Sequence, residues 1–432
     1  EKADVYIVNT CTVTNIADRK SRKMLHRAKR NNPEAFVVAA GCYVDSSKKT
    51  QGAEKSIDLF ISNKEKERIL ELVEAAMAES FGEQEDGFPA CEDRAVRGVK
   101  KQAGEGAEEE RSLFSPEARK ECHTRAFLNI QSGCNQFCTY CIIPYVRGAL
   151  KSRTEEDVLS EVEELAGNGI IEVVLTGIHL SSYGVDLSEK KSFLELEGKP
   201  LLNLIRKIAA VKGIERIRLS SLEPRIITEA FVRDLSEIKE LCPHFHLSLQ
   251  SGCDTVLKRM NRHYTAEEYF EKVQLLRRYF THPSITTDII VGFPGESEEE
   301  FQETAAFVEK VAFAKVHIFK YSRRKGTMAD AMEGQVTEEE KGKRSGILME
   351  KEKDMEIIYR KEFINKEENV LFEEIVLVDG GEYLVGYNER YVRIGVRVQK
   401  RMEAEKRINT IGRVFLPGQE VFAGKMLLGQ CL

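Results

Sequence analysis

Six short apolar runs, each followed by a segment with helical periodicity, recur along this 432-residue chain. Strands that alternate with helices in series form parallel sheets covered by helices. Six such units predict a barrel or a partial barrel, whose reactive residues lie at the carboxyl ends of the strands. The runs are AFLNIQ (126–131), IIEVVLT (170–176), ERIRLS (215–220), HFHLSLQ (244–250), ITTDIIVGF (285–293) and KVHIFKYS (315–322).

Helix start signals lie between these runs. Thr154 precedes an apolar periodic segment that Gly167 closes. A capping box joins an N-cap Ser or Thr to a Glu three residues later. Two pairs have this spacing, Thr265 with Glu268 and Ser297 with Glu300.

The rest of the chain predicts three further regions. Residues 1–91 contain the apolar runs DVYIVNT, AFVVAAG and LFISN between helical patterns, which predicts an N-terminal parallel α/β domain. Residues 92–121 are charged and glycine-rich and indicate a linker or an exposed excursion. The barrel with a long trailing helix takes 122–365, and the short alternating strands of 366–432 predict a small antiparallel barrel.

Composition excludes several classes of protein. A hydrophobic fraction of 42% and a charged fraction of 31% exclude a disordered or collagen-like chain. No run of about 18 apolar residues is present, so we expect no membrane span. The net charge of -6 gives no indication of a nucleic-acid partner. Because the chain starts at Glu1 and a strand-like run follows at once, we expect that it begins inside a domain.

The motif with the strongest chemical content is QSGCNQFCTYCIIP, directly after the first strand of the six-unit series. It places Cys134, Cys138 and Cys141 in a C-x3-C-x2-C spacing, which favours a soft metal or an iron–sulfur cluster. Three ligands leave one iron of a cubane cluster open. A zinc site would need a fourth ligand, such as Cys122 or a histidine, and a redox dithiol would need only Cys138 and Cys141.

Two more cysteines follow neighbouring strands. Cys11 closes VYIVNTC and Cys42 closes VVAAGC, so both lie at one edge of the N-terminal sheet. Two loop cysteines at matched positions favour a shared metal site. The alternative is two buried structural cysteines, which are common.

The cysteine loop after the first β/α strand, with Tyr140 before the last cysteine, resembles the radical S-adenosylmethionine (SAM) superfamily. The resemblance implies a [4Fe-4S] cluster on Cys134, Cys138 and Cys141, whose open iron chelates SAM and cleaves it to a 5′-deoxyadenosyl radical. Candidate cofactor contacts at the strand ends, where turn chemistry or helix capping is the alternative, are Tyr140, Thr176, Gly177, Ser221, Glu223, Gln250, Arg262 and Asp288.

A closer resemblance covers essentially the whole chain. NTCTVTNIADRKSR, AAGCYVDSS, GCNQFCTYCIIPYVRG, VLTGIHLSSYG, RLSSLEP, HLSLQSGCDTVLKRMNRHYT, DIIVGFPGE and FKYSRRKGT together look like a methylthiotransferase. The resemblance implies an N-terminal α/β domain, a partial (β/α)6 radical SAM barrel and a C-terminal TRAM domain, which is OB-like. It also implies an auxiliary [4Fe-4S] cluster with three cysteines, of which Cys11 and Cys42 match two. No residue matches the third ligand, so the cluster is incomplete here unless Cys91 or Cys122 substitutes.

Within this family, TGIHLSSYG and SSLEP resemble the branch that acts on N(6)-threonylcarbamoyladenosine at position 37 of tRNA. The implied reaction replaces the carbon-2 hydrogen by a methylthio group, in the cytoplasm and by a monomer. The implied partners are the tRNA anticodon loop, a reductant such as flavodoxin or ferredoxin, and a sulfur source. Alternatives are the isopentenyladenosine branch, the branch for a ribosomal-protein aspartate, and a non-catalytic iron–sulfur or zinc protein that binds RNA.

Local basic segments provide the surfaces that an RNA would contact, since phosphates favour a basic stripe. The stripe on the expected helix after Cys11, for which a solvated helix face is the alternative, consists of Arg19, Lys20, Arg22, Lys23, Arg27, Lys29 and Arg30. Further clusters are 258–263 and 323–325. In the last domain Tyr383, Tyr387 and Tyr391 are candidates either for stacking on bases or for the hairpin core.

Overall fold

The computed structural model describes residues 3–12, 14–46, 56–81, 124–187, 196–418, 421–422 and 426–432. The chain divides into two compact units, residues 1–123 and residues 124–432. The predicted linker 92–121 and the cysteines Cys91 and Cys122 lie outside the described residues. No helix in the described ranges is both long enough and apolar enough to cross a membrane.

The first unit is a parallel α/β sheet, as predicted. Strand β2 is buried along its whole length, because α1 covers one of its faces and α3 covers the other. Such a strand has an uninterrupted apolar sequence, which explains the run FVVAAG. The strands are β1 (Val5–Thr10), β2 (Phe36–Gly41) and β3 (Leu59–Ile61), and the helices are α1 (Asn15–Asn31), α2 (Cys42–Ser46), η2 (Lys66–Arg68, 3-10) and α3 (Ile69–Phe81).

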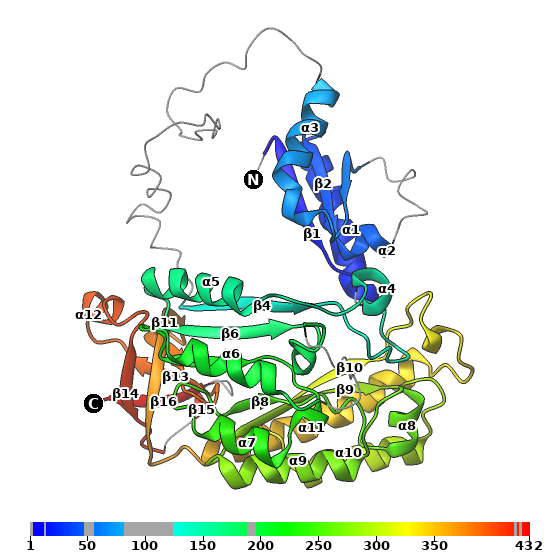
Figure 1. Ribbon diagram of the computed structural model, residues 1–432. Coiled ribbons are helices and arrows are strands. Elements are labelled where there is room, and N and C mark those ends of the chain that lie inside the picture. Colours follow the sequence, from blue (N-terminus) through cyan, green and yellow to red (C-terminus); the bar gives the residue numbers. More distant parts are fainter. Residues whose placement is uncertain are drawn as a thin grey trace. The chain divides into compact units, whose positions relative to one another are not determined.

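The second unit contains the predicted six-stranded parallel sheet, curled into a half-barrel (Figure 1). Strands β4, β6 and β7 form one part of this sheet, and β8, β9 and β10 form the other. A parallel bridge between Leu222, which follows β7, and Leu247, which follows β8, joins the two parts. The short β5 runs antiparallel to the end of β4. The strands are β4 (Arg125–Ser132), β5 (Lys151–Ser152), β6 (Glu172–Gly177), β7 (Arg216–Leu219), β8 (His244–His246), β9 (Ser284–Val291) and β10 (Lys315–Lys320).

Helices pack on the outside of this sheet and bury one continuous apolar core. Both predicted capping boxes form, at Thr265 with Glu268 and at Ser297 with Glu300. The helices are α4 (Ile143–Arg147), α5 (Glu155–Gly167), α6 (Lys199–Ala209), α7 (Glu229–Ser236), α8 (Asp254–Arg259), α9 (Ala266–Tyr279), α10 (Glu298–Val311) and α11 (Glu338–Lys361), with 3-10 turns η4 (Leu180–Ser182), η5 (Pro224–Ile226) and η6 (Met328–Asp330).

The C-terminal region forms its own sheet, ordered β13-β12-β11-β14-β16-β15. It is antiparallel as predicted, except that β13 pairs in parallel with β16 and thereby curls the sheet on itself. Its elements are β11 (Glu367–Val378), β12 (Gly381–Tyr387), β13 (Arg393–Arg397), α12 (Arg401–Glu405), β14 (Ile411–Phe415), β15 (Val421–Phe422) and β16 (Met426–Cys431).

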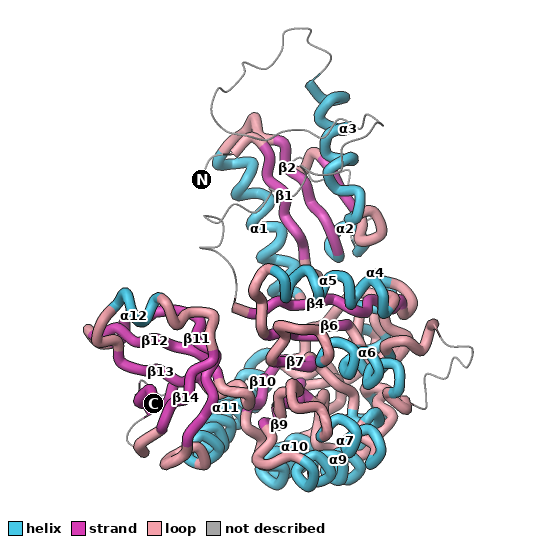
Figure 2. Tube along the Cα trace, turned by 60° about the vertical axis from the view of Figure 1, so that its left-hand side comes forward, coloured by secondary structure: helices cyan, strands magenta, loops and turns pink. Residues whose placement is uncertain are grey.

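This C-terminal sheet closes the amino end of the half-barrel, opposite the cysteine loop (Figure 2). Arg216 donates to the carbonyls of Asn369 and Tyr387, and Arg218 donates to those of Asn388 and Glu389. Arg216 and Arg218 thus use main-chain acceptors, whereas Arg125 joins the same two regions through side chains, by an ion pair with Glu373 and a hydrogen bond to the hydroxyl of Tyr391.

A buried carboxylate holds these arginines in place. Glu172 is fully buried and accepts from the Nε atoms of Arg125 and Arg218, each at 2.8 Å. Burial alone would raise the pKa of Glu172, but the charges of Arg218 and Arg125 outweigh it and hold the pKa below its ordinary value. Glu172 is therefore ionised, and its negative charge offsets part of the positive charge of the arginines.

The three tyrosines of the last domain differ in burial. Tyr383 belongs to the core of the C-terminal sheet, as one of the two expected uses requires. Tyr387 and Tyr391 stack on each other with their ring centroids 4.7 Å apart, and the guanidinium of Arg125 lies over both rings. Tyr387 is half-buried and Tyr391 is exposed, so these two rings lie outside the hairpin core.

Candidate active site at the carboxyl ends of the strands

The cysteine loop begins with a turn that only glycine can make. Gly133 has a φ of +69°, and a Cβ built there would lie 1.9 Å from the carbonyl oxygen of Ala149. The next residue, Cys134, donates its N–H to the carbonyl of Gly148 at 3.2 Å. The loop is thus fixed against the segment that leads into β5.

The three thiols lie close enough to influence one another. The N–H of Cys141 donates to the carbonyl of Cys138 at 2.9 Å. Burial raises the pKa of Cys134 and raises that of Cys141 to about 12, and the neighbouring thiols add to both shifts. Among the described residues, no three Cys, His, Asp or Glu side chains form a group that could hold a metal ion.

A half-buried arginine, Arg262, reaches this loop from the turn after α8. Arg262 donates from Nη1 to Cys138 Sγ at 3.3 Å and from Nε to the hydroxyl of Tyr264 at 2.9 Å. Tyr264 in turn donates to the carbonyl of Ser248 beyond the end of β8. A positive charge is therefore fixed beside the sulfur that would carry negative charge as a thiolate.

Side chains from other loops fix the middle of the cysteine loop. Asn261 donates to the carbonyls of Gln136 and Phe137, and Arg225 donates to Gln136 Oε1 at 2.9 Å. Phe137 has a φ of 49°, a left-handed conformation that these bonds maintain. Tyr140 packs on the apolar cluster that contains Met260.

The ends of β4 and β6 meet beneath the loop. Gln131 is fully buried, and its Oε1 accepts the N–H of His179 at 2.8 Å. A Cβ on Gly177 would lie 2.9 Å from this oxygen and would displace the side-chain amide of Gln131. Thr176 donates its hydroxyl to the carbonyl of Leu128.

His179 presents an unsatisfied atom to the same region. Its Nδ1 lies 2.7 Å from Ser182 Oγ, whereas its Nε2 is buried without a hydrogen-bond partner. Burial and the charges of Arg262 and Arg225 lower the pKa of His179 to about 3. The ring is neutral at ordinary pH and can hydrogen-bond to a bound molecule without taking up a proton.

The end of β7 supplies a carboxylate and hydroxyls. Glu223 is buried and accepts from Arg225 Nε at 2.7 Å, while its own N–H donates to Ser181 Oγ. The hydroxyl of Ser220 is buried without a partner, and Ser221 follows it half-buried. Glu223 therefore orients the arginine that holds Gln136.

Gln250 follows β8, whereas Asp288 lies within β9, three residues before its end. Gln250 has a φ of 72°, donates its N–H to the carbonyl of Asp288 and accepts from the N–H of Ile290. The carboxylate of Asp288 lies 3.4 Å from Nε2 of His246 in β8. Asp288 is therefore placed deeper along the strands than the sequence predicts, whereas Thr176, Gly177, Ser221 and Gln250 lie at or beyond the strand ends.

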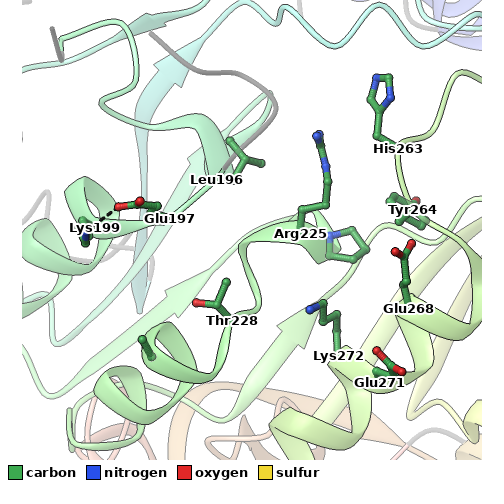
Figure 3. A pocket seen from close by; sticks show the side chains of 12 residues that line it. Leu196, Glu197, Lys199, Arg225, Thr228, His263, Tyr264, Glu268, Glu271 and Lys272 are labelled. Atoms are coloured by element: carbon green, nitrogen blue, oxygen red, sulfur yellow. Dashed lines mark ion pairs between the residues drawn. The ribbon is translucent and has the colours of Figure 1, made fainter. Parts of the chain in front are cut away.

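A cleft of about 660 Å³ opens beside this end (Figure 3). Its walls come from the start of α6, the segment after β7 and the first turns of α9. Arg225 and Tyr264 line it, and both also belong to the hydrogen-bond network of the cysteine loop. One layer of side chains thus separates the cleft from that loop.

In the first unit, Cys11 and Cys42 occupy matched positions, as the sequence indicated. Each directly follows one of two paired residues, Thr10 in β1 and Gly41 in β2. Cys11 is exposed, whereas Cys42 is buried and accepts from Asn63 Nδ2 at 3.5 Å.

The basic stripe lies on α1. Six of its seven cations are exposed, but Lys29 donates to the carbonyl of Ala35 and forms an ion pair with Asp58 at 2.8 Å. Arg22 pairs with Asp18 on the same helix. Lys29 therefore has a structural role within the unit.

Sequence reasoning missed several residues that shape this site. Gln131, Gln136, His179, Arg225 and Asn261 connect the strand ends to the cysteine loop. His179 lies inside the quoted segment TGIHLSSYG, and its position directly after a strand was a usable signal. The contacts of the others join loops far apart in the sequence.

Comparison with known proteins identifies two regions. Residues 128–308 match the radical SAM superfamily, and residues 1–62 match an uncharacterized protein family, UPF0004. A radical SAM methyltransferase, TsrM from Kitasatospora setae, has a similar fold (TM-score 0.52, 17% identity, 76% of this chain and 64% of that one).

Three curated relatives match most of the chain. The threonylcarbamoyladenosine tRNA methylthiotransferases MtaB of Bacillus subtilis and Aquifex aeolicus are 35% and 36% identical over 91% and 92% of this chain, and over 82% and 91% of their own. A tRNA-2-methylthio-N(6)-dimethylallyladenosine synthase of Caldicellulosiruptor saccharolyticus is 37% identical over 80% of this chain and 69% of its own. These matches, with the cysteine loop at the strand ends, show that the chain belongs to the methylthiotransferase family of radical SAM enzymes.

Proposed function

We propose that this enzyme adds a methylthio group to carbon-2 of N(6)-threonylcarbamoyladenosine at position 37 of tRNA. The observation that carries the proposal is the cysteine loop at the carboxyl end of the half-barrel, in a chain whose relatives of that activity match over about nine-tenths of its length.

The ligand chemistry at the strand ends supports a cluster with SAM, although the three thiols are not gathered into a metal-binding group among the described residues. Three thiols lie on one loop, and Arg262 provides a compensating charge at Cys138. Two polar atoms nearby, Nε2 of His179 and Oγ of Ser220, are buried without partners, which is the expected state of groups that bond to a ligand. We assign Cys134, Cys138 and Cys141 as the ligands of a [4Fe-4S] cluster.

When bound, the cluster and SAM supply the one-electron chemistry that starts the reaction, and the protein orients and shields it. Gln131 and Gly177 contact each other where β4 and β6 end, next to the cysteine loop. His179 is neutral above a pH of about 3 and offers a hydrogen bond that does not depend on pH in that range. Glu223 orients Arg225, which holds Gln136 and with it the cysteine loop. We propose that Tyr140, Thr176, Ser221, Gln250, Arg262 and Asp288 complete the SAM site.

In the N-terminal domain, Cys11 and Cys42 are the proposed ligands of the auxiliary cluster that holds the sulfur. Their matched positions after paired strands support this assignment. The exposed cations of α1 and the C-terminal barrel, as a TRAM domain, are the proposed RNA contacts, with flavodoxin or ferredoxin as reductant and the cytoplasm as the site of action.

The second candidate function is the same reaction on the dimethylallyl-type adenosine, because synthases of that branch match at similar identity. Mass spectrometry of tRNA nucleosides from cells with and without the gene separates the two. We expect the methylthio derivative of N(6)-threonylcarbamoyladenosine to disappear with the gene. Loss of the dimethylallyl derivative instead would exclude the proposed branch.

A further inference from the structure

The two branches differ in the chemistry of the group on N6. A threonylcarbamoyl group ends in a carboxylate and a hydroxyl, whereas a dimethylallyl group is purely apolar. A site that holds the first needs cations and hydrogen-bond donors, and a site that holds the second needs apolar walls. The cleft beside the cysteine loop has a lining that can be compared with these two requirements.

The lining of this cleft is mixed, with slightly more apolar than polar surface. Eight of its twelve side chains are charged, histidine or threonine, namely the cations Lys199, Arg225 and Lys272, the carboxylates Glu197, Glu268 and Glu271, and His263 and Thr228. Its volume, about 660 Å³, is ample for an amino-acid-sized group. The charged side chains offer ion pairs and hydrogen bonds to a charged substituent, and a dimethylallyl group would leave them unused.

One cation in the cleft is free to pair with an incoming anion. The ammonium of Lys272 has no ion-pair partner among the described residues, and in Figure 3 it extends from α9 toward the segment that carries Thr228. By contrast, Lys199 already pairs with Glu197 at 2.6 Å. The side chain of Thr228 accepts from the N–H of Phe231, which leaves its hydroxyl proton available to donate.

Arg225 and Tyr264 connect the cleft to the reactive end of the barrel. Arg225 reaches the cysteine loop through Gln136, and Tyr264 reaches Cys138 through Arg262. A group seated in the cleft is therefore next to the loop that would hold the cluster. This placement suits the far end of a substituent whose adenine lies at the strand ends.

We propose that this cleft holds the threonyl end of the hypermodified adenosine, with Lys272 and Arg225 facing its carboxylate and Thr228 its polar atoms. The proposal rests on the proposed function and deepens it by naming the residues that select a charged substituent. The same cations could instead meet a backbone phosphate, so the test must separate the two anions.

The test measures equilibrium binding of short anticodon stem-loop RNAs to the holoenzyme by fluorescence anisotropy, without reductant, so that no turnover occurs. Three RNAs carry at position 37 the free threonylcarbamoyl acid, its methyl ester, or unmodified adenosine. The variants are Lys272→Gln and Lys272→Arg. The matched control is Arg278→Gln, which removes an exposed cation of the same helix that faces Glu229.

We expect the unaltered enzyme to bind the acid about tenfold more tightly than the ester, the value of one charge-assisted hydrogen bond. Lys272→Gln should abolish this difference, Lys272→Arg should retain most of it, and Arg278→Gln should leave it unchanged. Equal weakening of all three RNAs by Lys272→Gln would indicate a phosphate contact and overturn the assignment, as would equal binding of acid and ester by the unaltered enzyme.

Failure of the cleft assignment is distinguishable from failure of the proposed function. Product formation by the unaltered enzyme on native tRNA reports the branch, independently of the acid-to-ester ratio. Methylthiolation of the threonylcarbamoyl substrate without discrimination against the ester overturns only the assignment of the cleft. Product from dimethylallyl RNA alone overturns both.

Discussion

The guanidinium of Arg262 donates to Cys138 Sγ at 3.3 Å, and no side chain of the cysteine loop itself provides such a charge. Arg262 comes from the turn after α8, more than a hundred residues further along the chain. A cation fixed at this distance stabilises the more negative, reduced state of an attached cluster.

Replacing this charge should therefore lower the reduction potential of the reconstituted cluster. For Arg262→Gln we expect a decrease on the order of 100 mV, from one unit charge a few ångströms away at an effective dielectric constant of about 20. The measurement is a redox titration followed by electron paramagnetic resonance. Arg259→Gln is the control, because Arg259 pairs with Glu300 and does not touch a thiol. An unchanged potential in Arg262→Gln would contradict the charge assignment.

The cysteine loop should account for one complete cluster. Cys141→Ser should reduce the iron content of anaerobically reconstituted protein by about four atoms per chain. Cys431→Ser, in the C-terminal strand β16, is the matched control and should retain all the iron. Retention of iron by Cys141→Ser would show that the loop is not the ligand set.

The buried carboxylate at the amino end of the barrel should be important for stability. Glu172→Gln removes the carboxylate that pairs with Arg216 and Arg218, whereas Arg125 keeps its ion pair with Glu373, and we expect the free energy of unfolding to fall by about 3–5 kcal/mol. The measurement is urea denaturation at neutral pH. Glu161→Gln removes a half-exposed partner of Arg153 and should cost about 1 kcal/mol or less. Similar losses in the two variants would mean that the buried cluster contributes no more than a surface pair.

His244 should make stability depend on pH. Burial, with help from Arg218, lowers the pKa of His244 from 6.5 to about 3 in the folded protein. The unfolded chain therefore binds one more proton between these values, and stability falls as the pH decreases from about 6.5 toward 3, by up to about 1.4 kcal/mol per pH unit. His244→Phe keeps a ring against Tyr391 and loses no hydrogen bond at Nδ1. In this variant the free energy of unfolding, measured by urea denaturation at pH values between 6 and 4, should depend less steeply on pH. An unchanged dependence would refute the argument.

The architecture could be predicted from the sequence because its signals are local. The runs that became β4, β6 and β9 each contain a cluster of apolar residues, and the capping boxes at Thr265 and Ser297 mark helices that begin there. The cysteine loop could likewise be predicted, since its three cysteines lie within eight residues.

The remainder of the site depends on contacts between distant loops. Nothing in the sequence distinguishes Arg225 from other basic residues, and only the fold places it between Glu223 and Gln136. Lys29 belonged to a basic stripe by sequence, but it lies where Asp58 can pair with it. Tyr391 lies against Arg125 and Arg218, a contact that only the tertiary structure creates, and the residue remains exposed.

The docking of the C-terminal sheet through Arg216 and Arg218 has an evolutionary consequence. Both arginines donate to main-chain carbonyls of residues 387–389 and of Asn369, which every amino acid at those positions would provide. Related enzymes can therefore exchange this module, as long as they keep the course of the backbone and the two side chains that Arg125 contacts, Glu373 and Tyr391. A chimera that grafts the C-terminal module of such a relative onto this barrel should dock in the same orientation without any compensating change in the arginines.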